Sequence, residues 1–357
     1  MTTFMQPSSP MSTGLTISSM APAGTTTPRD EGSLAPVRPN PWRSVGRTFE
    51  ATSSIELARI RSGLDWSVEK RGLRTDDLQP IPDAFAMRRQ DTGRILGIVG
   101  RDYVPMQNHD LFDFLSILAG ERELVFETAG AFQGGKIVWV LARIPDLGIR
   151  LGEDLSHTYL LISNGHAGNK VLTVAPTTIR VICQNTLALA EAQSAQRRRA
   201  GRSLAAGFQV RHTSGMPAAL ADIREAYAST FTAHARTREA WEHLARVPLT
   251  RQLEKDFIET VFRAQGPDEA DRAKTMRQQR EQRLSDILAS PTSQVRGTKD
   301  TAFSLLQATI EYIDHDRPTR TGESTSTTEA RLASATFGSG AELKEAAWTT
   351  ILAMSRA

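Results

Sequence analysis

Short strand-like runs separated by turn residues dominate the first half of the chain, after a polar N-terminal tail. Apolar, β-branched runs such as Ile95 to Val99 and Ile137 to Ile144 have the length and composition of strands. Asp91-Thr92-Gly93 and Gly134-Gly135 precede these runs and predict hairpin turns, because glycine readily adopts positive φ. Hairpins in series, with helices between only some of them, predict an α+β fold: an antiparallel sheet with helices on one face.

Helical periodicity replaces this pattern from Pro217 onward, where we predict helices near residues 217–246, 250–264, 268–289, 298–314, 327–336 and 340–356. Within the first half, capping and stop signals predict helices from Thr52 to Gly63, from Asn108 to about Leu118, and from Asn185 or Thr186 to Glu191. Together with composition, these patterns predict four segments. They are a disordered tail (1–40), an α+β core domain (41–192), a basic linker (193–216) and a mostly helical C-terminal region (217–357).

Composition bounds the environment of the protein. The 357 residues carry a net charge of +3 and one cysteine, Cys183, so no intrachain disulfide can form and a reducing cytoplasm is expected. No apolar run approaches the roughly 18 residues that span a membrane. The N-terminus lacks the basic-then-apolar pattern of a secretion signal. We therefore expect a cytoplasmic protein without a membrane partner.

Basic residues gather at the junction between the two halves, where Glu191 is the only acidic residue between Lys170 and His212. Clustered arginines bind phosphate through bidentate, permanently charged contacts, and such binding weakens with salt. We therefore predict a surface that binds nucleic acid, most simply single-stranded DNA. Its predicted residues are Lys170, Arg180, Arg197, Arg198, Arg199, Arg202 and Arg211. A solvated loop with incidental charge is the alternative.

Aromatic side chains near a basic surface would add base stacking. The candidates are Phe132, Trp139, Tyr159 and Phe208, although the apolar neighbours of Trp139 are more typical of a core position.

Other motifs do not define a reaction. Gly130 to Lys136 has the spacing G-x-x-x-x-G-K of a phosphate-binding loop, but Ile137 replaces the magnesium-binding Ser or Thr, and a strand-like run follows instead of a helix. A hairpin turn is the better interpretation. The seven histidines are scattered, and Asp314-His315-Asp316 is typical of a turn at a helix end, so neither a metal site nor a cofactor is predicted.

Cys183 gives a second hypothesis. With His166 upstream and Asn185 nearby, it has the residue types of a Cys-His-Asn nucleophilic site, and Arg180 and Gln184 would add polar groups. A lone cysteine at the end of a strand is more often a small buried apolar residue.

Two stretches of the chain are distinctive: Tyr103-Val104-Pro105-Met106-Gln107-Asn108 and Val181-Ile182-Cys183-Gln184-Asn185-Thr186. With further segments such as Ser163 to His166 and Glu311 to His315, they resemble the phage/plasmid-like protein family that carries domain of unknown function 932, over about residues 41–355. The resemblance implies a phage, prophage or plasmid origin, a bacterial cytoplasm and no established reaction. The hairpin-rich sheet also looks broadly like the single-strand annealing proteins of phage recombination systems, by analogy of fold.

The leading hypothesis is a nucleic-acid-binding protein without catalysis of its own, acting in single-strand binding or annealing during recombination or replication. We expect it to form a homo-oligomer partly through its C-terminal helices. The alternatives are an enzyme of unknown reaction with a site near His166, Arg180 and Cys183, and a structural or host-interaction protein that binds no nucleic acid.

Overall fold

A computed structural model describes residues 36–52, 54–119, 124–188, 208–210, 212, 223–262, 271–322 and 325–356. Residues 1–35 of the predicted tail and most of the predicted basic linker lie outside the described residues, so the disorder predicted for that part of the tail stays a prediction. Residues 36–40 are instead bonded to the rest of the protein: the Val37 N–H donates to the Ile182 carbonyl at 2.7 Å. The division of the chain into four segments also stays a prediction.

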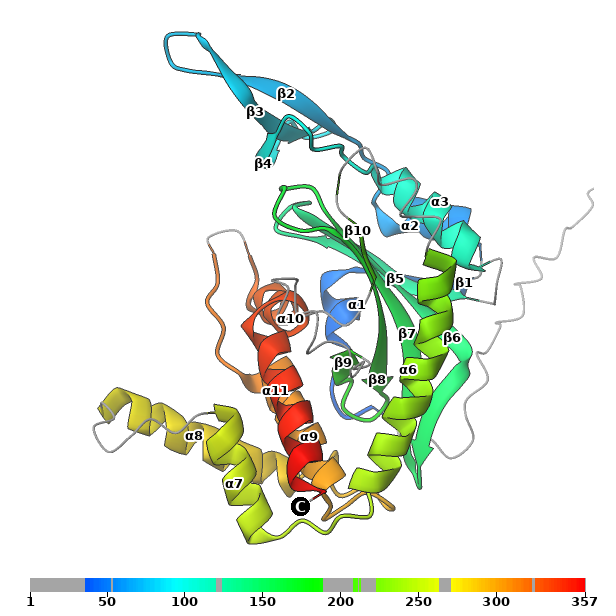
Figure 1. The fold of residues 1–357 in the computed structure, drawn as a ribbon, viewed down its shortest axis with the longest axis vertical. Coiled ribbons are helices and arrows are strands. Elements are labelled where there is room, and N and C mark those ends of the chain that lie inside the picture. The colour runs from blue at the N-terminus through cyan, green and yellow to red at the C-terminus, as the bar shows by residue number, and fades with distance from the viewer. Residues whose placement is uncertain are drawn as a thin grey trace, which may run out of the picture. The chain divides into compact units, whose positions relative to one another are not determined.

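Seven of the described strands form one antiparallel sheet (Figure 1). Six lie side by side in the order β1 (Arg47–Thr52), β5 (Val125–Phe132), β6 (Ile137–Leu151), β7 (Asp154–Gly165), β8 (Leu172–Arg180) and β10 (Phe208–Val210). The seventh, β9 (Thr186–Ala188), also pairs with β8. Gly134 and Gly135 turn β5 into β6 with φ values of 68° and 111°, so the predicted hairpin turn at this point is confirmed.

Three further strands form a second antiparallel sheet, which we call the arm: β2 (Val68–Arg74), β3 (Pro80–Arg89) and β4 (Ile95–Gly100). The pairing of β2 with β3 shifts register between Gly72 and Leu73, because β3 contains extra residues at that point. The predicted turn at Asp91-Thr92-Gly93 connects β3 to β4, and Gly93 has a φ of 71°.

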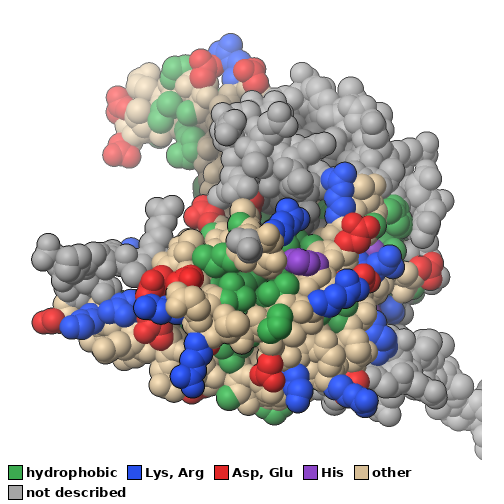
Figure 2. Space-filling model, turned by 60° about the horizontal axis from the view of Figure 1, so that its bottom comes forward, with side chains coloured by type: hydrophobic (Ala, Val, Ile, Leu, Met, Phe, Trp, Pro, Cys, Tyr) green, Lys and Arg blue, Asp and Glu red, His purple; other side chains and the backbone are tan. Residues whose placement is uncertain are grey.

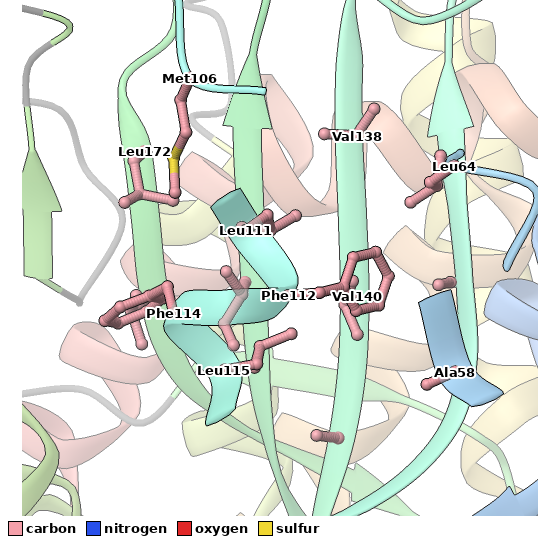
Figure 3. Close-up of a cluster of buried hydrophobic side chains, with 14 of the residues drawn as sticks. Ala58, Leu64, Met106, Leu111, Phe112, Phe114, Leu115, Val138, Val140 and Leu172 are labelled. Atoms are coloured by element: carbon pink, nitrogen blue, oxygen red, sulfur yellow. The ribbon is translucent and has the colours of Figure 1, made fainter. Parts of the chain in front are cut away.

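Alternation along β6 distributes its side chains between two hydrophobic cores. Val138 and Val140 face one core, which also contains Ala58 of α2 (Ile55–Ser62) and Leu111 and Phe112 of α3 (Asn108–Ala119) (Figure 3). The neighbouring residues of β6 face the other core, where the sheet meets α1 (Pro41–Val45) and α10 (Thr327–Phe337). Its members include Trp42, Phe132, Trp139, Leu141 and Leu332.

The C-terminal half is helical, as predicted. The described helices are α6 (Ile223–Leu244), α7 (Arg251–Phe262), α8 (Asp271–Leu288), α9 (Ala302–Glu311), a π-helical turn η1 (Tyr312–Asp316), α10 and α11 (Ser339–Met354). Their apolar stripes meet in a third core, whose largest members include Trp241, Phe257, Phe303 and Trp348. Each of the six predicted C-terminal helices corresponds to one of these elements.

The predicted α+β class, with an antiparallel sheet followed by a mostly helical half, is confirmed. Two details differ. Helices pack on both faces of the main sheet rather than on one, because both alternating sets of side chains in β6 are apolar. The short helix predicted from Asn185 or Thr186 is wrong in its described part: residues 186–188 form β9, because hydrogen bonding to β8 overrides the local capping signal. Among the described helices, none is long and apolar enough to span a membrane.

Candidate functional site

The outer edge of β8 holds both ends of the segment that carries most of the predicted arginines. Ala188 of β9 pairs with Thr177, and Phe208 of β10 pairs with Val174. Thr177 and Val174 are three residues apart on one strand, which is about 10 Å at ~3.3 Å per residue. The chain between Ala188 and Phe208 is therefore attached at both ends to one edge of the sheet.

Thr186 anchors the first of these ends, with each of its polar groups hydrogen-bonded. Trp42 Nε1 donates to its hydroxyl at 3.0 Å, and its backbone N–H donates to Asp314 Oδ2 at 2.8 Å. Lys344 Nζ donates to its carbonyl at 2.6 Å and forms an ion pair with Asp314 at 2.5 Å. Because Lys344 and Asp314 are buried, these charge-assisted bonds fix the position of β9.

His212 anchors the second end, just beyond β10. Its carbonyl accepts a hydrogen bond from Val104 N at 3.0 Å, and its ring stacks on Tyr103 with a centroid separation of 5.0 Å. The Tyr103 hydroxyl in turn donates to the Gly165 carbonyl at 2.9 Å. Burial raises the pKa of Tyr103 and lowers the pKa of His212, and both shifts favour the neutral rings.

Lys170, the first predicted binding residue, has a structural partner. Its Nζ donates to the Phe337 carbonyl at the end of α10 at 3.1 Å and lies 5.5 Å from the Phe337 ring centroid. Partial burial lowers the pKa of Lys170. The ammonium thus binds a carbonyl at a helix C-terminus, where cations are stabilising. In this conformation it is not free to bind phosphate.

Arg180, the second, lies inside the protein. Its Nε donates to both carboxylate oxygens of Asp154, at 2.8 and 3.0 Å, and its Nη1 lies 3.4 Å from Cys183 Sγ. Thr298 donates a further hydrogen bond to Asp154 at 3.1 Å. Arg180 is 2% exposed, so phosphate cannot reach its guanidinium unless this region unfolds. Arg180 is therefore not available to bind nucleic acid in the folded protein.

The remaining five predicted residues, Arg197, Arg198, Arg199, Arg202 and Arg211, lie outside the described residues. In the sequence, Arg197, Arg198, Arg199 and Arg202 stand between β9 and β10, and Arg211 stands between β10 and His212.

Three of the four candidate stacking rings are core residues. Phe132 and Trp139 are fully buried, and Tyr159 is 6% exposed. The side chain of Phe208 lies outside the described residues. The three buried rings cannot stack on bases in this structure.

The structure does not bring His166, Arg180 and Cys183 into one site. Strands β7 and β8 pair from Ser163–Thr173 at one end to Ser156–Arg180 at the other. Thr173 and Arg180 are seven residues apart, about 23 Å at ~3.3 Å per residue. His166 follows the first end of this ladder and Cys183 follows the second, so the alternative enzyme site cannot form as hypothesised.

Cys183 itself has the properties of a buried structural thiol. It is fully buried, and burial raises its pKa to about 12, outweighing the opposing effect of the Arg180 guanidinium. A nucleophilic cysteine needs an accessible thiolate near neutral pH. The environment therefore disfavours Cys183 as a nucleophile.

His166 belongs to a separate polar cluster at the base of the arm. Its Nε2 lies 2.9 Å from Asn108 Oδ1, and Asn108 Nδ2 donates to the Trp66 carbonyl. Because the amide oxygen can only accept, Nε2 carries the proton and Nδ1 is a bare acceptor. Burial, with smaller effects of His212 and Arg89, lowers the pKa of His166 to about 3.

Sequence reasoning missed a partly buried ionic network around the π-helical turn η1. Arg38 Nε donates to Glu311 Oε1 at 2.9 Å, and its Nη2 donates to Asp316 at 3.2 Å. With Asp314 and Lys344, these residues join η1 to β9 and to the chain before α1. One signal was available: Lys344 lies on the same buried stripe of α11 as Ala347, Trp348 and Ile351, and a charge inside an apolar stripe needs a partner.

Two other predicted features have structural explanations. Gly130 to Lys136 forms the end of β5 and its turn into β6, not a loop that opens a helix. Asp314-His315-Asp316 lies in η1, with Asp314 and Asp316 engaged in the ion pairs above. Among the described residues, no group of three or more His, Cys, Asp or Glu side chains could hold a metal ion.

The face shown in Figure 2 carries both basic and acidic side chains and no purely basic patch. Lys and Arg side chains alternate there with Asp and Glu around a group of apolar side chains. The charge that a polyanion would need is therefore not supplied by the described residues of this face.

Comparison with known sequences assigns the chain to a family. Residues 95–336 match the domain of unknown function DUF932, and the chain belongs to that family. The matched region includes the β8 edge, Thr186 and η1. No curated protein matches the sequence, and no solved structure matches the fold.

Proposed function

We propose that this protein binds nucleic acid through the arginine segment, which we define as residues 189–207 and which joins β9 to β10. The observation that carries the proposal is the attachment of both ends of this segment to one edge of β8, within about 10 Å along the strand. Arg197, Arg198, Arg199 and Arg202 all lie between these two anchors in the sequence. Arg211, one residue before the His212 anchor, adds a fifth positive charge.

The two anchors support this interpretation. The buried Lys344–Asp314 pair holds Thr186 at one end, and the Tyr103–His212 stack holds the other. Buried ion pairs are weak contributors to stability but can fix a unique geometry. A precise geometry at both ends of a basic segment is what a binding element requires.

We further propose that the partner is DNA, with single-stranded DNA as the form bound in recombination or replication of a phage or plasmid. The resemblance to phage/plasmid-like proteins and to single-strand annealing proteins supports this choice, and it would place the protein in a bacterial cytoplasm. Phe132, Trp139 and Tyr159 are buried, so in this proposal the arginines bind the phosphates and these three rings take no part in base stacking.

The test is fluorescence anisotropy with labelled single-stranded and duplex oligonucleotides over a range of salt concentrations. Wild-type affinity should fall steeply with salt. Replacing Arg197, Arg198, Arg199 and Arg202 with Ala should weaken binding. It should also reduce the salt slope on single strands by up to about 2.8, or about 0.7 for each lost phosphate contact.

A control variant removes the same charge elsewhere. Arg236, Arg246, Arg251 and Arg356 are exposed residues of the helical half, and changing these four to Ala should leave the salt slope unchanged. Absent or salt-insensitive binding by the wild type would overturn the proposal, as would equal losses in the two variants. Absent binding to both forms of DNA would favour the structural or host-interaction alternative.

A further inference from the structure

Large exposed apolar side chains are concentrated in two parts of the described chain. One is the arm, with Leu78, Ile81, Ile95 and Ile98, and the other is the outer face of α2, with Leu57 and Ile60. Among the described C-terminal helices, only Met276 belongs to this group. Exposed apolar patches of this kind mark interaction surfaces, so the arm and α2 are better candidates for association than the C-terminal helices.

The end of the arm, residues 74–83, presents apolar side chains with acidic neighbours; we call it the arm tip. Leu78 is 69% exposed and has a φ of 65°, a left-handed conformation that costs a leucine about 1–3 kcal/mol. Hydrogen bonds from Leu78 N to the Thr75 carbonyl and from Arg74 Nη1 to the Leu78 carbonyl, both 2.9 Å, hold this conformation. Leu78 thus combines a strained backbone conformation with an aliphatic side chain that is exposed to solvent.

Acidic charge predominates at the arm tip. Asp76 and Asp77 are exposed beside Leu78, and Arg74 is the only basic residue of this segment. Asp83 forms an ion pair with Arg101 at 2.5 Å, and Asp76 and Asp77 then exceed Arg74 by one negative charge. Two carboxylates next to the tip make it a poor surface for phosphate and a suitable one for a partner that is apolar and basic.

The outer face of α2 has the complementary chemistry. Ser54 Oγ caps the helix by accepting from Leu57 N, and Ala58 and Ser62 are buried against the rest of the protein. Leu57 and Ile60 remain 41% and 57% exposed on the opposite side. This helix therefore carries apolar residues on a face that no described element covers.

Basic charge predominates beside this face. Arg61 is exposed in the last turn of α2, and the Arg47 guanidinium lies against Gly63, the residue that ends the helix. Among described side chains, neither Arg61 nor Arg47 forms an ion pair, whereas Arg59 is paired with Glu56 at 2.7 Å. The outer face of α2 thus offers two unpaired cations next to two exposed aliphatic side chains.

We infer that the arm tip of one copy of this protein docks on the outer face of α2 of a second copy. Leu78 and Ile81 would cover Leu57 and Ile60, and the Asp76 and Asp77 carboxylates would approach Arg47 and Arg61. Both halves of the contact are present in one chain and are exposed there, which argues for a second copy rather than for an unrelated partner. The inference does not depend on nucleic-acid binding.

The contact joins two different surfaces, the arm tip and the outer face of α2. Two copies related by a two-fold axis can make this contact twice and close a dimer. If each copy instead uses its two surfaces on different neighbours, head-to-tail contacts build rings or filaments. The proposed contact therefore predicts a dimer or a larger assembly.

The experiment is mass measurement of the full chain in solution as a function of protein concentration. Wild-type protein should form dimers or larger species, whereas L78D and I60D should each be monomeric. Both positions are exposed, so circular dichroism and cooperative unfolding should match those of the wild type. The variant M276D is the control, since Met276 is 51% exposed outside both surfaces and its change should leave assembly intact.

Mixing the two variants tests whether the arm tip of one copy binds the α2 face of another. L78D keeps an intact α2 face and I60D keeps an intact arm tip, so an equimolar mixture should form dimers and nothing larger. A wild type that is monomeric at every concentration would overturn the inference. So would a mixture that stays monomeric, a mixture that forms long assemblies, or single variants that assemble like the wild type.

Discussion

Arg180 of β8 and Asp154 of β7 form an ion pair inside the protein, with side chains that are 2% and 3% exposed. Removing one partner leaves an unpaired buried charge, which costs about 3–5 kcal/mol. Asp154→Ala should therefore lower the free energy of unfolding by this amount in urea titrations. The neighbouring Glu153→Ala is the control, because its ion pair with Arg296 is long, at 3.8 Å, and exposed. It should cost about 0–1 kcal/mol. Equal losses in the two variants would contradict the buried geometry.

Lys344 provides a second test of the buried charges, at the anchor of β9. Lys344→Met keeps the length of the side chain but leaves the Asp314 carboxylate and the Thr186 carbonyl without their cationic donor. We expect a loss of about 3 kcal/mol or more in the free energy of unfolding, measured by chemical denaturation. Lys299→Met, at an exposed position, is the matched control and should stay within about 0.5 kcal/mol of the wild type. A neutral effect of Lys344→Met would mean that Thr186 does not depend on this pair.

Local signals predicted much of the fold. The turn glycines Gly93 and Gly134 adopt the positive φ that their hairpins require, and apolar periodicity located the six C-terminal helices. Strand β9 escaped prediction because its residues carry a helix-capping signal, and only pairing with Thr177 to Ile179 makes them a strand. The packing of helices on both faces of the main sheet was not predicted. The hairpin turns that predicted the sheet do not show which of its side chains a helix will cover.

The candidate site was less predictable because its contacts join distant parts of the chain. In the sequence, Arg180 looks like the neighbouring arginines. Its burial depends on the ion pair with Asp154, which is 26 residues away and could not be inferred locally. The bond between Arg38 and Glu311 spans 273 residues. Lys170 likewise looked available for phosphate until α10 brought the Phe337 carbonyl to it. Residue type predicts the chemistry that a side chain offers, whereas tertiary packing decides whether that chemistry reaches solvent.

The Cys183 thiol should be unreactive in the native protein. It is fully buried and burial raises its pKa to about 12, so both access and thiolate formation are suppressed. A chromogenic disulfide reagent should titrate almost no thiol under native conditions and one equivalent after unfolding in guanidinium, since the chain has a single cysteine. Prompt reaction of the native protein, abolished by Cys183→Ser, would instead revive a nucleophilic role for this residue.

Stability should depend on pH through His166, whose pKa is lowered to about 3 by burial. In the unfolded chain this side chain has an ordinary pKa of about 6.5, so it binds a proton below that pH while the folded form stays neutral. Its contribution to stability is therefore complete above pH ~6.5 and is lost as the pH falls towards 3, by up to about 1.4 kcal/mol per pH unit. His166→Gln keeps a donor for Asn108 but cannot titrate, so its unfolding free energy should fall less between neutral pH and about pH 4. Urea titrations of the two proteins across this range measure the difference. Identical pH profiles would show that the pKa of His166 is the same in the folded and the unfolded protein.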